Sequence, residues 1–246
     1  MKAVTAVSTV ESARRLRRMY GRLAAAYGPQ HWWPAETPFE VVLGAYLTQN
    51  TAWKAVERSL ANLREAGALT LDGLRALSLD ELRRLIRPSG FTSRKAPALK
   101  AFIAMLDAEF GGSLDLLAAA PTPALRQRLL ALPGVGPETA DAILLYALGA
   151  SVPVADEYLR RIAERHQLLS LPPNSKSPSV SKHYDALSAL TRQAFAADPA
   201  PQHVHLFNEF HALTVAVGKA HCRRVQSCEG CPLAPDLGRR GRKRQS

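Results

Sequence analysis

The chain has 246 residues, of which 47% are hydrophobic, and a formal net charge of +11. This length suits one large domain or two closely packed ones, and no apolar run reaches the roughly 18 residues that a membrane-spanning helix needs. The positive charge favours a polyanionic partner. Five of the charges lie in the last nine residues, which leaves +6 for the rest of the chain. The N-terminus is too rich in Ser and Thr for a secretory signal, so we expect an intracellular protein.

The predicted secondary structure is helical along the whole chain. Nearly every periodic segment has the spacing of an α-helix, and none shows sustained alternation, so the sequence predicts an all-α fold. Thr37 with Glu40, and Ser78 with Glu81, have the spacing of capping boxes that open two helices. A Pro- and Ser-rich segment, 171–181, predicts a loop between helices. The principal predicted helices are 12–27, 38–49, 52–65, 93–109, 123–132, 137–148, 157–165, 182–196 and 204–219.

A very short turn, Leu132-Pro133-Gly134-Val135-Gly136, separates two of these helices. Gly134 and Gly136 permit backbone angles that side chains forbid, so successive N–H groups can point outward together. The next helix begins at Pro137, and its N-terminal dipole is directed at the same place. We expect Val135 to pack inward and to fix the angle between the helices. Such a hairpin can hold a phosphate without reading sequence, and a plain tight turn is the alternative.

Residues 132–146, followed by Val152-Pro153-Val154-Ala155-Asp156, resemble the helix-hairpin-helix, loop and aspartate signature of the endonuclease III superfamily of DNA glycosylases. Asp156 follows Gly136 by twenty residues, as in that superfamily, and the resemblance extends from about His31 to Cys231. It implies a two-domain helical glycosylase fold, acting as a monomer in the cytoplasm and nucleoid on double-stranded DNA with damaged bases. The expected parts are a helical domain of 1–35 and 156–221, a six-helix barrel with the hairpin at 36–155, a cysteine loop at 222–237 and a basic disordered tail at 238–246.

Asp156 is the predicted catalytic residue. Breaking an N-glycosidic bond builds positive charge on the sugar, which an ionised carboxylate stabilises while it activates the attacking water. Asp156 also precedes a predicted helix, where Asp is a common N-cap, and both roles can coexist. Bifunctional members of the superfamily carry a lysine where this chain has Glu138. A carboxylate cannot form a Schiff base, so the resemblance implies a monofunctional enzyme that leaves an abasic site.

Trp32, Trp33 and Pro34 are the predicted base pocket. Two adjacent tryptophans either pack in a core or line a cavity, where they would stack on a flipped base. Indoles favour a cationic base such as 3-methyladenine. With the segments 47–51 and 87–91, these residues resemble the type III 3-methyladenine DNA glycosylases. The alternatives are an endonuclease III-like glycosylase and lyase for oxidised pyrimidines, and a DNA-binding protein without catalysis.

Further DNA contacts follow from superfamily position. Gln49 would fill the gap left by the flipped nucleotide, and Phe91 would wedge into the opposite strand. Arg94 and Lys95 are expected either at phosphates or on a solvated helix face. The predicted DNA-binding residues are Gln49, Phe91, Gly134, Val135, Gly136 and Thr139.

The three cysteines, Cys222, Cys228 and Cys231, fall within ten residues. An odd, clustered set in an intracellular chain indicates metal or cluster ligation rather than disulfides. The spacing resembles the C-terminal iron–sulfur loop of endonuclease III relatives, which has four cysteines separated by six, two and five residues. Here the first gap is one residue shorter, and the fourth position falls at Leu237 or Gly238.

Three interpretations of this loop remain open. A [4Fe–4S] cluster could be held by the incomplete cysteine set with Asp236 or His221 as the fourth ligand. The site could instead be a decayed one that holds nothing. Zinc at the same thiolates is the third possibility.

Overall fold

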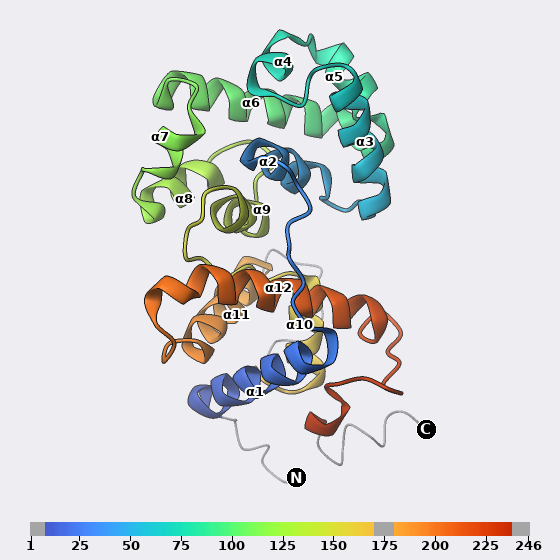
Figure 1. Ribbon diagram of the computed structural model, residues 1–246, viewed down its shortest axis with the longest axis vertical. Helices are drawn as coiled ribbons and strands as arrows, with labels where there is room; N and C mark the ends of the chain where they lie inside the picture. The colour runs from blue at the N-terminus through green and yellow to red at the C-terminus, as the bar shows by residue number, and fades with distance from the viewer. Residues whose placement is uncertain (1–7, 170–179, 238–246) are drawn as a thin grey trace. The chain divides into compact units, whose positions relative to one another are not determined.

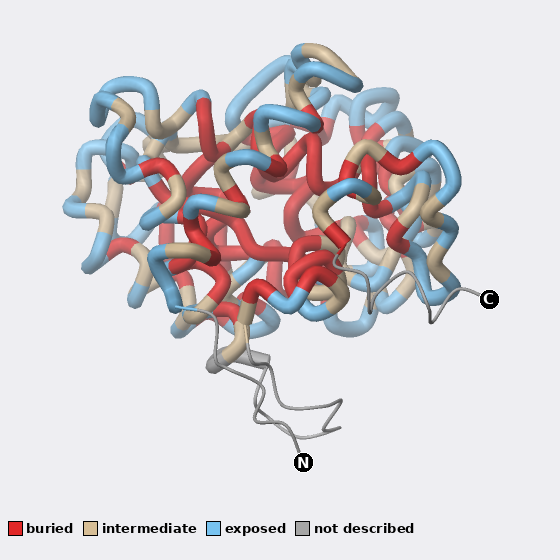
Figure 2. Tube along the Cα trace, turned by 90° about the horizontal axis from the view of Figure 1, so that it is seen from below, coloured by how far each residue is buried: buried red, intermediate tan, exposed pale blue. Residues whose placement is uncertain are grey.

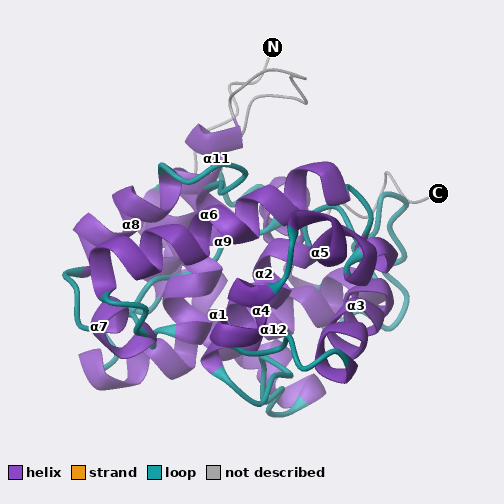
Figure 3. Cartoon of the chain, turned by 90° about the horizontal axis from the view of Figure 1, so that it is seen from above, coloured by secondary structure: helices purple, strands orange, loops and turns teal. Residues whose placement is uncertain are grey.

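The computed structural model describes residues 8–169 and 180–237, and every regular element in that part of the chain is helical (Figure 3). The predicted all-α class is therefore confirmed. The chain divides into two compact units, residues 33–152 and residues 1–32 with 153–246. No helix in the described ranges has the length and apolarity needed to cross a bilayer. The predicted basic tail, 238–246, lies outside the described residues.

The first unit, residues 1–32 with 153–246, joins the N-terminal helix to helices from the C-terminal third of the chain. Helix α1 packs against both α11 and α12, although it is separated from them by more than 150 residues of sequence (Figure 1). Tyr20, Phe195 and Phe210 form a cluster of aromatic rings at this contact, with centroids 5.2 to 6.3 Å apart. The helices of this unit are α1 (Thr9–Tyr27), α10 (Glu157–Arg165), α11 (Val180–Ala194), η3 (Ala200–Gln202), α12 (His203–Ala220) and η4 (Ala234–Asp236).

The second unit is built around α2 (Pro38–Leu47), whose residues from Phe39 to Leu47 are all buried. A helix that is apolar all round belongs in a core, and the neighbouring helices cover this one on several sides. Figure 2 shows buried stretches of the trace flanked by exposed turns. The other helices of this unit are α3 (Trp53–Glu65), α4 (Leu71–Ala76), α5 (Leu79–Leu85), η1 (Arg87–Ser89), α6 (Thr92–Phe110), α7 (Leu114–Ala118), α8 (Thr122–Leu130), α9 (Pro137–Ala142) and η2 (Ile143–Ala147).

Several local predictions need correction. Helix α9 gives way to the π-helical η2 at Ile143, so 137–148 is not one continuous α-helix. The capping box at Ser78 is confirmed. At Thr37 only half of the predicted box forms: Thr37 Oγ1 accepts from the Glu40 N–H, but the Glu40 carboxylate accepts from the N–H of Glu36. Helix α11 begins inside the segment predicted as a loop, and the rest of that loop lies outside the described residues.

Candidate functional site

The turn between α8 and α9 combines one unusual backbone conformation with one ordinary one. Gly134 has φ +75°, a left-handed value that favours glycine, whereas Gly136 has φ −97° and ψ 177°, which any residue adopts. The expectation that both glycines need special angles is therefore wrong for Gly136. A Cβ at Gly136 would meet no atom within 4 Å, so its backbone is approachable from that side. Val135 is buried, as inward packing requires.

A charged pair ties the two hairpin helices together. Arg126 on α8 donates from Nε and Nη2 to the two carboxylate oxygens of Asp141 on α9, at 2.6 and 2.9 Å. The Asp141 side chain is fully buried. Such two-point pairing is strong and directional, so it fixes the hairpin angle together with Val135.

Gln49 lies against the hairpin. Its Nε2 donates to the carbonyl oxygen of Gly134 and to Oγ1 of Thr139, each at 2.9 Å. Thr139 is buried, while Gln49 is half-exposed. Two motifs that are 85 residues apart in sequence are therefore joined by one amide group.

A hollow of about 210 Å³ joins Gln49 and the hairpin to Phe91. Phe91 is 51% exposed and has φ +49°, which is uncommon for a bulky residue and indicates local strain. The guanidinium of Arg94 lies 4.9 Å from the centre of its ring. Residues in such conformations cluster at active sites and ligand-binding segments, so Phe91 is a candidate for contact with a partner. The hollow is lined by Gln49, Asn50, Phe91, Arg94, Lys95, Ala98 and Gly134.

Lys95 corrects an expectation. It was placed at phosphates or on a solvated face, but it is 3% exposed and its ammonium group is directed inward. Its ammonium group donates to Thr51, just before α3, and to Ser89, just before α6. Sequence periodicity does not reveal a contact such as that with Thr51, which is 44 residues away.

Asp156 is the N-cap of α10. Its Oδ1 accepts from the N–H of Leu159 at 2.8 Å, and the residue is 8% exposed. Burial raises the pKa of Asp156 to about 6, although backbone N–H groups of Leu159 and Tyr158 oppose that rise. The carboxylate is thus held in place and poorly hydrated, while it remains ionised at neutral pH.

One residue of the same unit, His211, lies beside Asp156, and Trp32 and Lys219 follow it in a series of contacts. Nε2 of His211, on α12, lies 3.9 Å from Oδ2 of Asp156. Burial lowers the pKa of His211 to about 3, so its imidazole is neutral and adds no positive charge beside the carboxylate. Trp32 makes an edge contact with His211 at 5.5 Å, and Nζ of Lys219 lies 6.0 Å from the Trp32 ring. The sequence analysis did not single out His211 and Lys219, although they stand eight residues apart on a largely apolar helix.

Trp33 has a different environment, in the second unit. Its ring lies 5.4 Å from that of Trp53 and 5.2 Å from that of Tyr146. All three residues are half-buried, and Pro34 is exposed. Gly44 makes room for Trp33, because a Cβ there would lie 3.0 Å from the indole Nε1. Trp53 and Tyr146 were missed from the sequence, although the chain's three tryptophans fall within 22 residues of one another.

Glu138 lies in the first turn of α9 and is exposed. No amine is therefore carried at the position where bifunctional relatives have their lysine.

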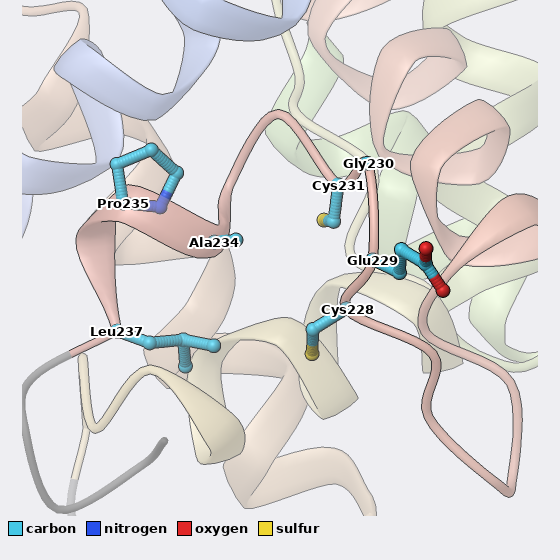
Figure 4. A pocket seen from close by; sticks show the side chains of 7 residues that line it. All are labelled: Cys228, Glu229, Gly230, Cys231, Ala234, Pro235 and Leu237. Carbon is cyan, nitrogen blue, oxygen red and sulfur yellow. The ribbon is translucent and has the colours of Figure 1, made fainter. Parts of the chain in front are cut away.

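The cysteine loop does not supply a fourth cluster ligand. Cys228, Cys231 and Leu237 border a hollow of about 570 Å³ (Figure 4). The buried, apolar Leu237 stands at the fourth position of the motif and has no donor atom. Cys222 is also buried, and the nearby thiols help burial to raise the pKa of Cys231. In the part of the chain that the structure describes, no three His, Cys, Asp or Glu side chains are arranged to hold a metal ion.

The two substitute ligands differ in their engagement. Asp236 Oδ2 accepts from Arg15 at 2.6 Å and lies 3.2 Å from Nδ1 of His166, so this carboxylate is already paired. His221 has its Nδ1 2.9 Å from the carbonyl oxygen of Ser227, and this contact does not involve its Nε2. The loop therefore supplies three thiols and no fourth cysteine for a [4Fe–4S] cluster.

Comparison with known proteins agrees with this geometry. Residues 43–182 match the model of the HhH-GPD superfamily base excision DNA repair protein. A Methanocaldococcus jannaschii protein that carries the name of a DNA repair glycosylase is 37% identical over 88% of this chain and 92% of its own. A thymine-DNA glycosylase of Aeropyrum pernix is 28% identical over 89% of this chain and 91% of its own.

Among solved structures, the H. pylori 3-methyladenine DNA glycosylase MagIII, bound to 1,N6-ethenoadenine, has a TM-score of 0.68 and 26% sequence identity. That similarity covers 90% of this chain and all of the other. The chain therefore belongs to the HhH-GPD superfamily of base excision DNA repair proteins and is a DNA glycosylase.

Proposed function

We propose that this glycosylase releases alkylated purines, such as 3-methyladenine, from double-stranded DNA by hydrolysis and leaves an abasic site. The observation that carries the proposal is the cluster of the aromatic rings of Trp33, Trp53 and Tyr146, three residues that are half-buried. Electron-rich rings attract a cationic base, and alkylation at a ring nitrogen gives a purine that charge. The similarity to MagIII, solved with an adenine-derived base, supports a purine substrate.

We assign the stacking role to Trp33 rather than to Trp32. The Lys219 ammonium already lies near the Trp32 ring, and a second cation there would meet like charge. The Trp33 ring contacts the rings of Trp53 and Tyr146, so it is part of an aromatic group. Its position also depends on the space beside Gly44, which fixes the orientation of the indole.

The chemistry requires Asp156 as a carboxylate. In the transition state the C1′–N bond breaks and its electron pair passes to the base, so positive charge develops on the sugar. A poorly hydrated carboxylate stabilises that charge more strongly than one in water. Water adds its oxygen to C1′ and gives a proton to Asp156, which then releases it to solvent. A base that already carries positive charge leaves as a neutral molecule, so no general acid is required.

DNA binding in this proposal uses the hairpin and the two side chains beside it. The backbone N–H groups of Gly134 and Gly136 hold a phosphate, while that of Val135 is bonded to the Leu132 carbonyl. Gln49 occupies the space of the flipped nucleotide, and Phe91 enters the opposite strand. Thr139 is buried, so we assign it the role of positioning Gln49 rather than of touching DNA.

A panel of duplexes, each with one lesion, tests the proposal. Single-turnover excision is measured with and without alkali, which separates base loss from strand cleavage. We expect release of 3-methyladenine and of related alkylated purines, with strand breaks only after alkali. Preferential release of thymine from mismatches, or of oxidised pyrimidines with direct strand cleavage, would contradict the proposal and indicate a pyrimidine substrate.

A further inference from the structure

We infer that Lys95 is a positioning residue, whose ammonium group sets the spacing of the two loops that carry Gln49 and Phe91 so that both side chains enter DNA together. The inference rests on the DNA contacts proposed above for those two residues. It assigns Lys95 no contact with DNA.

The three acceptors of Lys95 bracket both loops. Nζ donates to the carbonyl oxygen of Leu47 at 2.7 Å, to Oγ1 of Thr51 at 2.7 Å and to the carbonyl oxygen of Ser89 at 2.8 Å. Leu47 and Thr51 stand two residues before and after Gln49, and Ser89 stands two residues before Phe91. One ammonium group therefore forms hydrogen bonds with residues at the ends of both loops.

Thr51 makes a second link between the same loops. Its Oγ1 lies 2.8 Å from the carbonyl oxygen of Ser89 and 3.0 Å from that of Gln49. The hydroxyl accepts from Lys95 and can donate to either carbonyl. The loops are thus joined by a small polar network rather than by a single bond.

The loop that ends at Phe91 is strained at that residue. Phe91 has φ +49°, which is uncommon for a bulky side chain, whereas Asn50, with φ +50°, is of a residue type that tolerates this region. Nζ of Lys95 also lies 5.7 Å from the centre of the Phe91 ring. Burying a lysine is costly, and burial lowers the pKa of Lys95 to about 8.

Lys100 offers a matched control on the same helix. Its Nζ also donates three hydrogen bonds, all of them to main-chain carbonyls, those of Leu74, Arg75 and Leu77 at the end of α4. The ammonium group is thus bound in a similar way, but neither DNA-contacting loop is involved. Substitution of Lys100 therefore measures the cost of losing such a cap.

The experiment compares Lys95→Met with Lys100→Met. Affinity for a duplex with an abasic-site analogue is measured in each background, with and without Gln49→Ala and Phe91→Ala. In the wild type and in Lys100→Met, each alanine substitution should weaken binding roughly tenfold. In Lys95→Met the same substitutions should cost less than about threefold, because the two side chains are no longer aligned.

Equal costs in all three backgrounds would overturn the role of Lys95 while leaving the DNA contacts intact. If the alanine substitutions have no effect in the wild type, the proposed contacts are wrong and the inference falls with them. Should Lys95→Met fail to fold, Thr51→Val removes one acceptor and the second link without leaving a charge unpaired. In the Thr51→Val background, Gln49→Ala and Phe91→Ala should each cause a smaller loss of DNA affinity than in the wild type. An unchanged loss would refute the inference.

Discussion

Replacement of Asp156 by Asn tests the site through stability as well as activity. Asn has nearly the same shape, is an equally good N-cap, and can still accept from the Leu159 N–H. The pKa of Asp156 rises from 3.8 to about 6 in the folded protein. A raised pKa means that the protonated form is favoured by folding, so this stabilisation is complete below pH 3.8 and is lost as the pH rises through 6. At neutral pH, holding the ionised carboxylate costs the folded state about 3 kcal/mol, which Asp156→Asn should recover in part.

The assay is urea unfolding of the wild type and of Asp156→Asn between pH 4 and pH 8. The stability difference should be near zero at pH 4 and should favour the variant increasingly up to a plateau above pH 7. Excision should fall by about 10²–10³ or more, with affinity for abasic DNA nearly unchanged. Wild-type excision should rise with pH through about 6 as Asp156 ionises. A variant that is less stable at neutral pH, or a difference that does not vary with pH, would refute the account of a strained carboxylate.

The remaining predictions address the nucleophile, the base pocket and the cysteine loop. Borohydride should trap no protein–DNA adduct, since Glu138 occupies the lysine position; a strong adduct would show that another amine substitutes. Trp33→Leu should slow 3-methyladenine excision about five- to thirtyfold while abasic-site binding is retained, whereas Trp32→Leu should have the smaller effect. Parallel loss of melting temperature and abasic-site binding would instead assign Trp33 to the core. Purified protein should contain, at most, substoichiometric iron, because Leu237 cannot ligate; four irons and four sulfides per chain would contradict this.

What the sequence could predict was local. Periodicity and capping rules depend only on neighbouring residues. They therefore predict the long amphipathic helices, the hairpin and the N-cap at Asp156. The short helices α4 and α7 span too few residues to show a period, although each follows a Ser or Thr N-cap. The burial of Lys95 and the approach of His211 to Asp156 depend on segments more than 40 residues apart, and no local rule contains that information.

Because Trp33 packs beside Gly44, the packing of α2 and that of the Trp33, Trp53 and Tyr146 rings depend on each other. The Trp33 indole lies against the place that a side chain at position 44 would take. The sizes of the side chains at positions 33 and 44 are therefore coupled. A larger residue at position 44 should displace the indole, and a smaller one at position 33 should leave a void against α2. Attempts to redesign the lesion preference at Trp33 should therefore succeed with compensating growth at position 44. Gly44→Ala alone should impair the enzyme, but in combination with Trp33→Leu it should restore part of the lost stability.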